Sequence, residues 1–153
     1  MSDETTESII KRITVKYPEH ILLPSGHRSD IFFDCIKLTP TELARLAALA
    51  VGDMKIDSFD MAVGIAYTGI LFAGAVAGGR SVGILTKEGA FIGPDLKGKK
   101  VLVVDDVIVK GQQVSEAAQK ITDLGAQVVG FACIVKKDPS SALTEPVYSA
   151  HQV

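Results

Sequence analysis

The sequence predicts an α/β fold in which helices flank a parallel β-sheet, and three observations support this prediction. The chain has 153 residues, 47% of them hydrophobic and 22% charged, which suits one domain with a core and excludes a disordered chain. Four runs of residues are continuously apolar, as expected of strands buried on both faces. Segments of small or amphipathic character separate these runs, and strands that alternate with helices imply right-handed βαβ units.

The N-terminal region predicts one helix followed by a small hairpin. Apolar residues recur there at helical spacing, and Pro18 is expected to end the helix. The recurring residues are Ile9, Ile10, Ile13 and Tyr17. Two short strands are expected at residues 20–23 and 31–36, because residues 24–29 between them include turn-forming Pro and Gly.

A second helix is predicted to begin after Thr39. This threonine can cap the helix, Pro40 suits the first helical position, and Glu42 can bond back to the amide of the cap residue. The residues expected on its buried face are Leu43, Leu46, Ala47 and Ala50.

The rest of the chain alternates between strands and helices. The four apolar runs expected to form strands are residues 61–65, 81–86, 101–105 and 128–135. Helices are expected at residues 70–77 and 114–124, whereas residues 87–100, with three glycines and a proline, are expected to form a loop. The second of these helices should bury a face made of Val114, Ala117, Ala118, Ile121 and Leu124. A last strand is expected near Val147.

Composition narrows the classes of function. Sixteen basic and eighteen acidic residues give a net charge of −2, so the chain lacks a global positive field for nucleic acid or for an anionic membrane. No apolar stretch is long enough to span a bilayer, and the acidic start at residues 1–4 differs from a secretory signal. Cys35 and Cys133 lie in apolar runs without metal-ligand spacing, which predicts buried free thiols. We therefore expect a cytoplasmic protein that binds neither nucleic acid nor membranes.

The most informative stretch follows the predicted strand at residues 101–105. Asp105 and Asp106 stand at the end of this strand, and a turn containing Gly111 leads directly into the next helix. Amides at such a turn and at a helix start suit a phosphate, and Lys110 adds a formal positive charge. Carboxylates accept hydrogen bonds from sugar hydroxyls. A phosphorylated sugar satisfies both parts of the loop, although the two aspartates can also be read as simple strand-end turn residues.

Other phosphate-binding folds are excluded by the sequence. The chain has neither the P-loop pattern nor a glycine-rich dinucleotide fingerprint after a strand. A response-regulator receiver would need most of its length after Asp106, where only 47 residues remain (153 − 106).

Four segments together resemble one known family. Residues 101–108, with Gly111 three positions on, resemble the phosphoribosyl pyrophosphate signature of the type I phosphoribosyltransferases. Residues 25–34, 66–70 and 86–89 resemble the hood, the pyrophosphate loop and the start of the mobile loop of the orotate enzymes in that family. The similarity runs in the correct order from about residue 5 to residue 137.

The resemblance implies a fold and a domain organisation. It implies the type I phosphoribosyltransferase fold, a Rossmann-like parallel sheet flanked by helices, with a small N-terminal hood. On this basis residues 1–153 form a single domain, with the hood at about 1–38, the core at about 39–137 and a tail at 138–153.

The resemblance also implies an activity, with roles for individual residues. The reaction would convert orotate and phosphoribosyl pyrophosphate to orotidine monophosphate and pyrophosphate, with Mg²⁺ bound through phosphoribosyl pyrophosphate and not directly by the protein. The residues implied in catalysis are Asp105, Asp106 and Lys87. Those implied in substrate binding are Phe32 and Phe33 at the base, Tyr67, Thr68 and Gly69 at the pyrophosphate, and Val109, Lys110, Gly111, Gln112 and Gln113 at the 5′-phosphate. The partners would be a sugar phosphate and a nucleobase, and the family's two-fold symmetry implies a homodimer.

Several positions depart from the family pattern and keep two alternatives open. Hydroxyl residues are missing around Gly111, Pro24 and Thr68 stand where the family has lysines, and apolar residues 90–92 replace the basic part of the mobile loop. One alternative is a catalytically impaired homologue that senses phosphoribosyl pyrophosphate or a nucleotide. The other is a phosphoribosyltransferase for a different base. Among the histidines, only His27, in the hood turn, is a candidate for mutation.

Overall fold

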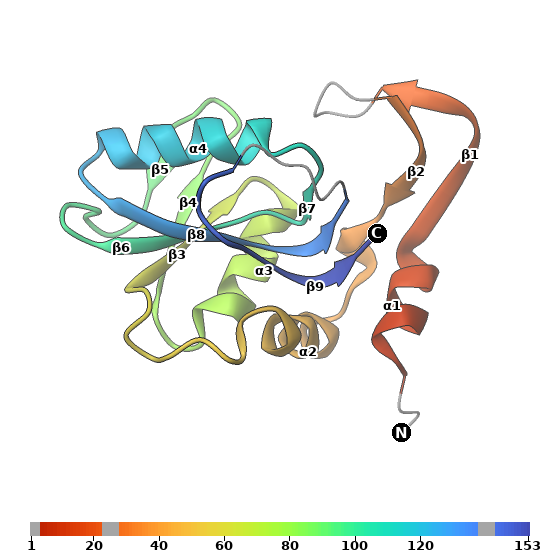
Figure 1. Ribbon diagram of the computed structural model, residues 1–153, viewed down its shortest axis with the longest axis horizontal. Coiled ribbons are helices and arrows are strands. Elements are labelled where there is room, and N and C mark those ends of the chain that lie inside the picture. The colour runs from red at the N-terminus through yellow and green to blue at the C-terminus, as the bar shows by residue number, and fades with distance from the viewer. Residues whose placement is uncertain (1–3, 23–27, 138–142) are drawn as a thin grey trace.

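The computed structural model describes the backbone of residues 4–22, 28–137 and 143–153, and the side chains in these ranges except for residues 18–30. Residues 24–27 of the predicted turn, including His27, lie outside the described part. The described chain forms a central sheet with helix α4 (Gln112–Asp123) on one face and helices α2 (Pro40–Val51) and α3 (Thr68–Ala77) on the other (Figure 1). Helix α1 (Thr6–Ile13) and the hairpin that follows it lie at one side of this assembly (Figure 1).

The central sheet confirms the predicted α/β class. Its strands in chain order are β3 (Met61–Ile65), β4 (Ser81–Leu85), β5 (Phe91–Ile92), β6 (Lys100–Val104), β7 (Val107–Ile108), β8 (Gln127–Lys136) and β9 (Val147–Gln152). Their spatial order is β5-β4-β3-β6-β8-β7, with β9 also paired to β8. Every pairing in this sheet is parallel except that of β4 with β5. The predicted tail therefore contributes a strand to the main sheet.

The predicted hairpin is present, with boundaries that differ from those expected. Strands β1 (Thr14–Leu22) and β2 (Arg28–Phe33) pair antiparallel, and a short 3₁₀ helix, η1 (Cys35–Lys37), follows them. The prediction that the first helix reaches Tyr17 was wrong, because α1 ends at Ile13 and Thr14 pairs with Phe33. β-Branched Thr14 and Val15 suit this extended pairing better than a further helical turn.

Two further predictions need correction. Leu124, expected on the buried face of α4, is 51% exposed, because the helix ends at Asp123 and the chain turns away. The segment 87–100, expected to be a loop, contains strand β5 and the buried side chain of Leu96. Pairing with β4 orders this segment although its glycines and proline favour turns.

Apolar side chains pack on both faces of the sheet. Ile9, Leu46 and Phe72 are buried on the face that α1, α2 and α3 cover. Val114 and Ile121 of α4 are buried on the opposite face. Cys35 and Cys133 are both buried and free, as the sequence predicted. Among the described residues, no helix is both long and apolar enough to cross a bilayer.

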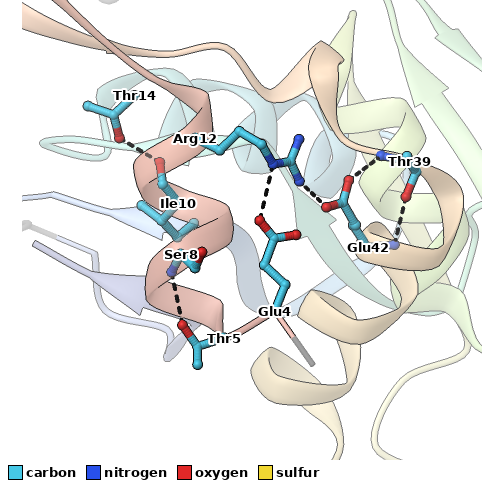
Figure 2. A network of polar contacts seen from close by, with 8 residues as sticks. All are labelled: Glu4, Thr5, Ser8, Ile10, Arg12, Thr14, Thr39 and Glu42. Atoms are coloured by element: carbon cyan, nitrogen blue, oxygen red, sulfur yellow. Dashed lines mark hydrogen bonds and ion pairs between the residues drawn. The ribbon is translucent and has the colours of Figure 1, made fainter. Parts of the chain in front are cut away.

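A polar network links the N-terminal helix to α2 (Figure 2). Thr39 and Glu42 form the predicted capping box, in which the Thr39 amide donates to Glu42 Oε1 at 2.9 Å and the Glu42 amide donates to Thr39 Oγ1 at 3.2 Å. Arg12 of α1 pairs with both Glu42 and Glu4. The Thr39 amide, together with Arg12, lowers the pKa of Glu42. The network therefore connects the helix that precedes the hairpin to the core helices.

Candidate functional site

The acid pair lies in a kink between β6 and β7, and hydrogen bonds to β8 hold it in place. The Asp105 amide donates to the Ala132 carbonyl at 3.0 Å, and the Ile134 amide donates to the Asp106 carbonyl at 2.9 Å. Each carboxylate also accepts a hydrogen bond from the next residue's amide, at 2.8 Å in both cases. Backbone hydrogen bonds thus fix both aspartates at the carboxyl end of the sheet.

The two aspartates differ in their surroundings. Asp105 is 7% exposed, whereas Asp106 is half-buried. Burial, followed by the neighbouring charge of Asp106, raises the pKa of Asp105 well above its ordinary value. Gly69 at the start of α3 packs directly against Asp105, since a Cβ on Gly69 would lie 3.0 Å from Asp105 Cα and 2.9 Å from the Val104 carbonyl oxygen. Only glycine allows this approach of the two loops.

A cavity of about 510 Å³ opens beside the acid pair. The loops after β3, β4 and β6, helix α4 and the end of β2 contribute its walls. Most of the predicted site residues line it, namely Phe32, Phe33, Tyr67, Thr68, Lys87, Asp105, Asp106, Val109 and Gln113. The structure therefore brings together segments that the sequence separates by more than 80 residues (113 − 32 = 81).

The remaining predicted residues adjoin this cavity. Lys110, Gly111 and Gln112 line a smaller hollow together with Asp105. Gly111 precedes α4 with a φ of 89°, a conformation that favours glycine, and no side chain caps this helix start. The first amides of an α-helix have no partner within the helix. The arrangement therefore presents amide donors and the positive end of the helix dipole next to the carboxylates.

The loop after β4 is a tight turn held by its own hydrogen bonds. The Thr86 amide donates to the Ala90 carbonyl at 2.8 Å, and the Ala90 amide donates to Thr86 Oγ1 at 3.0 Å. Lys87 projects from this turn, with its ammonium 4.5 Å from the centre of the Tyr67 ring. The peptide bond between Ala66 and Tyr67 is cis. Lys87 and the loop after β3 thus form one wall of the cavity.

Sequence reasoning missed three charged residues that line the cavity. They are Glu116, Lys120 and Lys137. Lys137 follows β8, with its ammonium 5.9 Å from the centre of the Phe33 ring. The rule that ligands bind beyond the carboxyl ends of parallel strands applies to β8 as well, so Lys137 could have been found in this way. The signal for Lys120 is helical spacing, since it lies seven residues after Gln113 on the same face of α4.

The described residues contain no cluster of three or more His, Cys, Asp or Glu side chains arranged to bind one metal ion. What they offer is two carboxylates for hydroxyl groups, amides for a phosphate, and several lysines for other anions. This order of donors and acceptors suits a phosphorylated sugar with a second anionic group.

Comparison with known proteins agrees with this arrangement. Residues 81–149, which include the acid pair and α4, match the phosphoribosyl transferase domain. A curated orotate phosphoribosyltransferase from Caldanaerobacter subterraneus subsp. tengcongensis is 29% identical over 151 residues, covering 90% of this chain and 77% of that protein. Over these residues the chain is similar to the phosphoribosyltransferases. The resemblance to the orotate branch of this family, predicted from four short segments, is confirmed.

Solved structures of phosphoribosyltransferases share the fold. Orotate phosphoribosyltransferase from Aeropyrum pernix superposes with a TM-score of 0.78 at 19% identity, covering 97% of this chain and 94% of that one. The Mycobacterium tuberculosis orotate enzyme, solved with phosphoribosyl pyrophosphate, gives 0.72 at 22% identity, covering 96% and 93%. UMP synthase from Leishmania donovani gives 0.81 at 21% identity, and there the chain covers 35% of the longer protein.

Proposed function

We propose that the protein transfers a phosphoribosyl group from phosphoribosyl pyrophosphate to orotate, giving orotidine monophosphate and pyrophosphate. The observation that carries the proposal is the position of the fixed acid pair, between an amide-rich helix start and a wall with lysine side chains. A pentose with an anionic group at each end matches this order. Similarity to a curated orotate enzyme supports orotate as the acceptor and favours neither a sensor nor a transferase for another base.

The sugar and its 5′-phosphate are assigned to the loop between β6 and α4. Asp105 and Asp106 accept hydrogen bonds from the ribose hydroxyls, and the amides of residues 109–113 donate to the phosphate. Lys110 adds a positive charge there. Hydroxyl side chains are absent from this loop, so backbone donors supply most of the phosphate contacts.

The base is assigned to the wall formed by the end of β2. Phe32 is 36% exposed and lines the cavity next to Phe33, which gives a flat apolar surface for a planar ring. The ammonium of Lys137 lies beside the same wall. A base that carries a carboxylate complements this combination of an aromatic surface and a positive charge.

The transfer breaks the bond between ribose C1 and a pyrophosphate oxygen and forms a bond from C1 to a ring nitrogen of the base. Positive charge develops on the sugar while negative charge develops on the leaving group. The aspartates stabilise the sugar, and Lys87, at the opposite wall, stabilises the pyrophosphate. Mg²⁺ bound through phosphoribosyl pyrophosphate would neutralise negative charge on the leaving group.

A homodimer is part of this proposal. Helix α3 is apolar on all sides, and Leu71, on its outer surface, is 47% exposed. Tyr67, just before the helix, is 70% exposed. An apolar helix surface next to the cavity suits contact with a second subunit. Sedimentation equilibrium measures the mass in solution, and a monomer at micromolar concentration would contradict this part of the proposal.

The enzyme proposal is tested by incubating the protein with Mg²⁺, phosphoribosyl pyrophosphate and orotate while pyrophosphate release is followed. Asp106→Asn is expected to lower the rate by about 10²–10³-fold, the usual cost of losing one transition-state contact. Asp123→Asn is the matched control, because Asp123 is exposed at the far end of α4. Binding without turnover would contradict the enzyme and indicate a sensor. Turnover that survives Asp106→Asn would contradict the site.

A further inference from the structure

Helix α4 lines the cavity along one of its faces, in addition to presenting its N-terminus there. Four of its residues line the cavity at spacings of three and four, which places them on one face of the helix: Gln113, Glu116, Ala117 and Lys120. Gln113 lies at the amide-rich end. Lys120 lies seven residues further on, about 10 Å along the helix axis at 1.5 Å per residue. The two ends of this face can therefore contact opposite ends of one ligand.

The Lys120 side chain reaches across to the turn after β4. A Cβ on Gly89 would lie 2.1 Å from Lys120 Nζ and 3.1 Å from its Cε, so the side chain occupies the space above this glycine. The turn that contains Gly89 also carries Lys87. Figure 1 shows the connection from β4 to β5 beside α4. Lys120 and Lys87 thus belong to the same wall of the cavity, although one comes from a helix and the other from a loop.

The tight turn limits the charge that the loop itself can supply. Thr86 accepts hydrogen bonds from the amides of Gly89 and Ala90, and strand β5 starts at Phe91, so the chain returns to the sheet directly after the turn. Lys87 is the cation in residues 86–92, and Glu88 next to it is acidic. A ligand with several negative charges at this wall needs a further cation from another element.

The ammonium of Lys120 is available for that role. In the part of the chain that the structure describes, the ion pairs involve Arg12 and Lys37 and none involves Lys120. Glu116, one helical turn before Lys120, is the other charged residue on this face of α4 and accepts a hydrogen bond from Gln112 at 3.4 Å. Lys120 is exposed to solvent, so a ligand anion can reach its ammonium without displacing a buried partner.

We propose that Lys120 binds the pyrophosphate end of the substrate, so that helix α4 holds the 5′-phosphate with its first amides and the leaving group with a lysine two turns later. This inference rests on the proposed function. It assigns to a helix a charge that the tight turn after β4 does not supply. The ligand class is an inorganic or sugar-linked pyrophosphate.

The test measures binding of two compounds separately by calorimetry: inorganic pyrophosphate with Mg²⁺, and ribose 5-phosphate. Lys120→Met retains the apolar stem and removes the charge. We expect it to weaken pyrophosphate binding about tenfold, because one charge-assisted contact at an exposed position is lost. Ribose 5-phosphate binding should change less than twofold, since that compound lacks the pyrophosphate. Lys120→Arg should restore pyrophosphate affinity.

Lys99→Met is the control, since Lys99 is an exposed lysine in the loop before β6 and does not line the cavity. Circular dichroism verifies that each variant is folded. If the unaltered protein binds pyrophosphate and Lys120→Met binds it equally well, the role of Lys120 is contradicted and the proposed function stands. If Lys120→Met lost as much affinity for ribose 5-phosphate as for pyrophosphate, the proposal would also be contradicted, since such a loss would indicate a structural role for Lys120. If the unaltered protein binds neither compound, the proposed function itself is contradicted.

Discussion

The helices that begin at the cavity differ from those that begin elsewhere in how their N-termini are satisfied. Helices α1 and α2 are capped by threonines: Thr5 Oγ1 accepts from the Ser8 amide at 3.1 Å, and Thr39 Oγ1 accepts from the Glu42 amide at 3.2 Å. Helices α3 and α4 begin after Tyr67 and Gly111, and neither has a side-chain cap. Both uncapped starts lie next to the acid pair.

This difference shows how one set of backbone groups serves two purposes. An uncapped helix start leaves amides without a partner inside the helix. Where stability alone matters, a threonine supplies the missing acceptor and contributes about 1 kcal/mol. At the cavity that acceptor is left to the ligand, so the helix gives up some stability and gains a place for an anion. Substitutions at the two kinds of helix start should therefore have different consequences.

The largest expected effect comes from adding a methyl group at the start of α3. In Gly69→Ala the new Cβ would meet the Val104 carbonyl and the Asp105 backbone at 2.9–3.0 Å, and backbone atoms cannot move aside easily. We expect the α3 start to shift away from the acid pair. Stability should fall by about 2 kcal/mol, as is usual for overpacking. Affinity for ribose 5-phosphate should fall about a hundredfold, since small misplacements of a site are costly.

The matched control makes the same substitution on the same helix. Apart from the adjacent residues and the nearby backbone of the helix itself, a Cβ on Gly74 would meet no atom within 4 Å. Gly74→Ala should therefore raise stability by about 0.5–1 kcal/mol, because alanine is the better helix former, and leave binding unchanged. Urea denaturation and calorimetry measure both quantities. If the two variants changed stability and ribose 5-phosphate affinity equally, the start of α3 would be no more sensitive to an added methyl group than the rest of the helix.

The second effect concerns the cost of burying Asp105. Because its pKa is raised in the folded protein, the folded state binds more protons than the unfolded chain between the ordinary carboxyl pKa of 3.8 and the raised value. Stability from this group is therefore present below pH 3.8 and lost as pH rises through the raised pKa. In Asp105→Asn the amide oxygen can still accept from the Asp106 amide, and the charge is gone.

We expect Asp105→Asn to stabilise the protein by about 1–2 kcal/mol at pH 8, with a smaller gain at pH 4. The same variant should bind ribose 5-phosphate more weakly, because a neutral amide is a poorer acceptor for hydroxyls. Urea denaturation at the two pH values measures the gain. A variant that is less stable at pH 8 would show that the Asp105 carboxylate supports the fold. It would contradict the inference that burial of this charge lowers the stability of the protein.

The features that could be predicted are those encoded in adjacent residues. The acid pair and Gly111 form a continuous stretch that ends a strand and starts a helix, and Thr39, Pro40 and Glu42 form a continuous capping signal. In each case the physical cause lies within one turn of backbone. The start of α2 and the bounds of β3 accordingly agree with expectation.

The features that were missed depend on contacts between distant segments. Lys137 and Lys120 reach the cavity only because β8 and α4 pack next to β6. The place of Lys137 after a strand and the helical spacing of Lys120 become informative only once this packing is known. The same holds for β1, where Pro18 signals an end and the chain nevertheless stays extended. The pairing of β1 with β2 is irregular between Lys16 and Ile21. This irregularity accommodates Pro18, which has no amide hydrogen to donate to the neighbouring strand.

The smallest effect is expected from removing a cap that lies far from the cavity. In Thr39→Ala the Glu42 amide loses its acceptor, whereas Arg12 can still pair with Glu42 (Figure 2). We expect stability to fall by about 1 kcal/mol, the usual cost of losing a threonine cap. Binding of ribose 5-phosphate and of orotate should change less than twofold, because α2 contributes no side chain to the cavity. A larger loss of orotate binding would mean that the connection from α2 through α1 to the hairpin holds Phe32 and Phe33 in place, in which case capping would serve both stability and ligand binding.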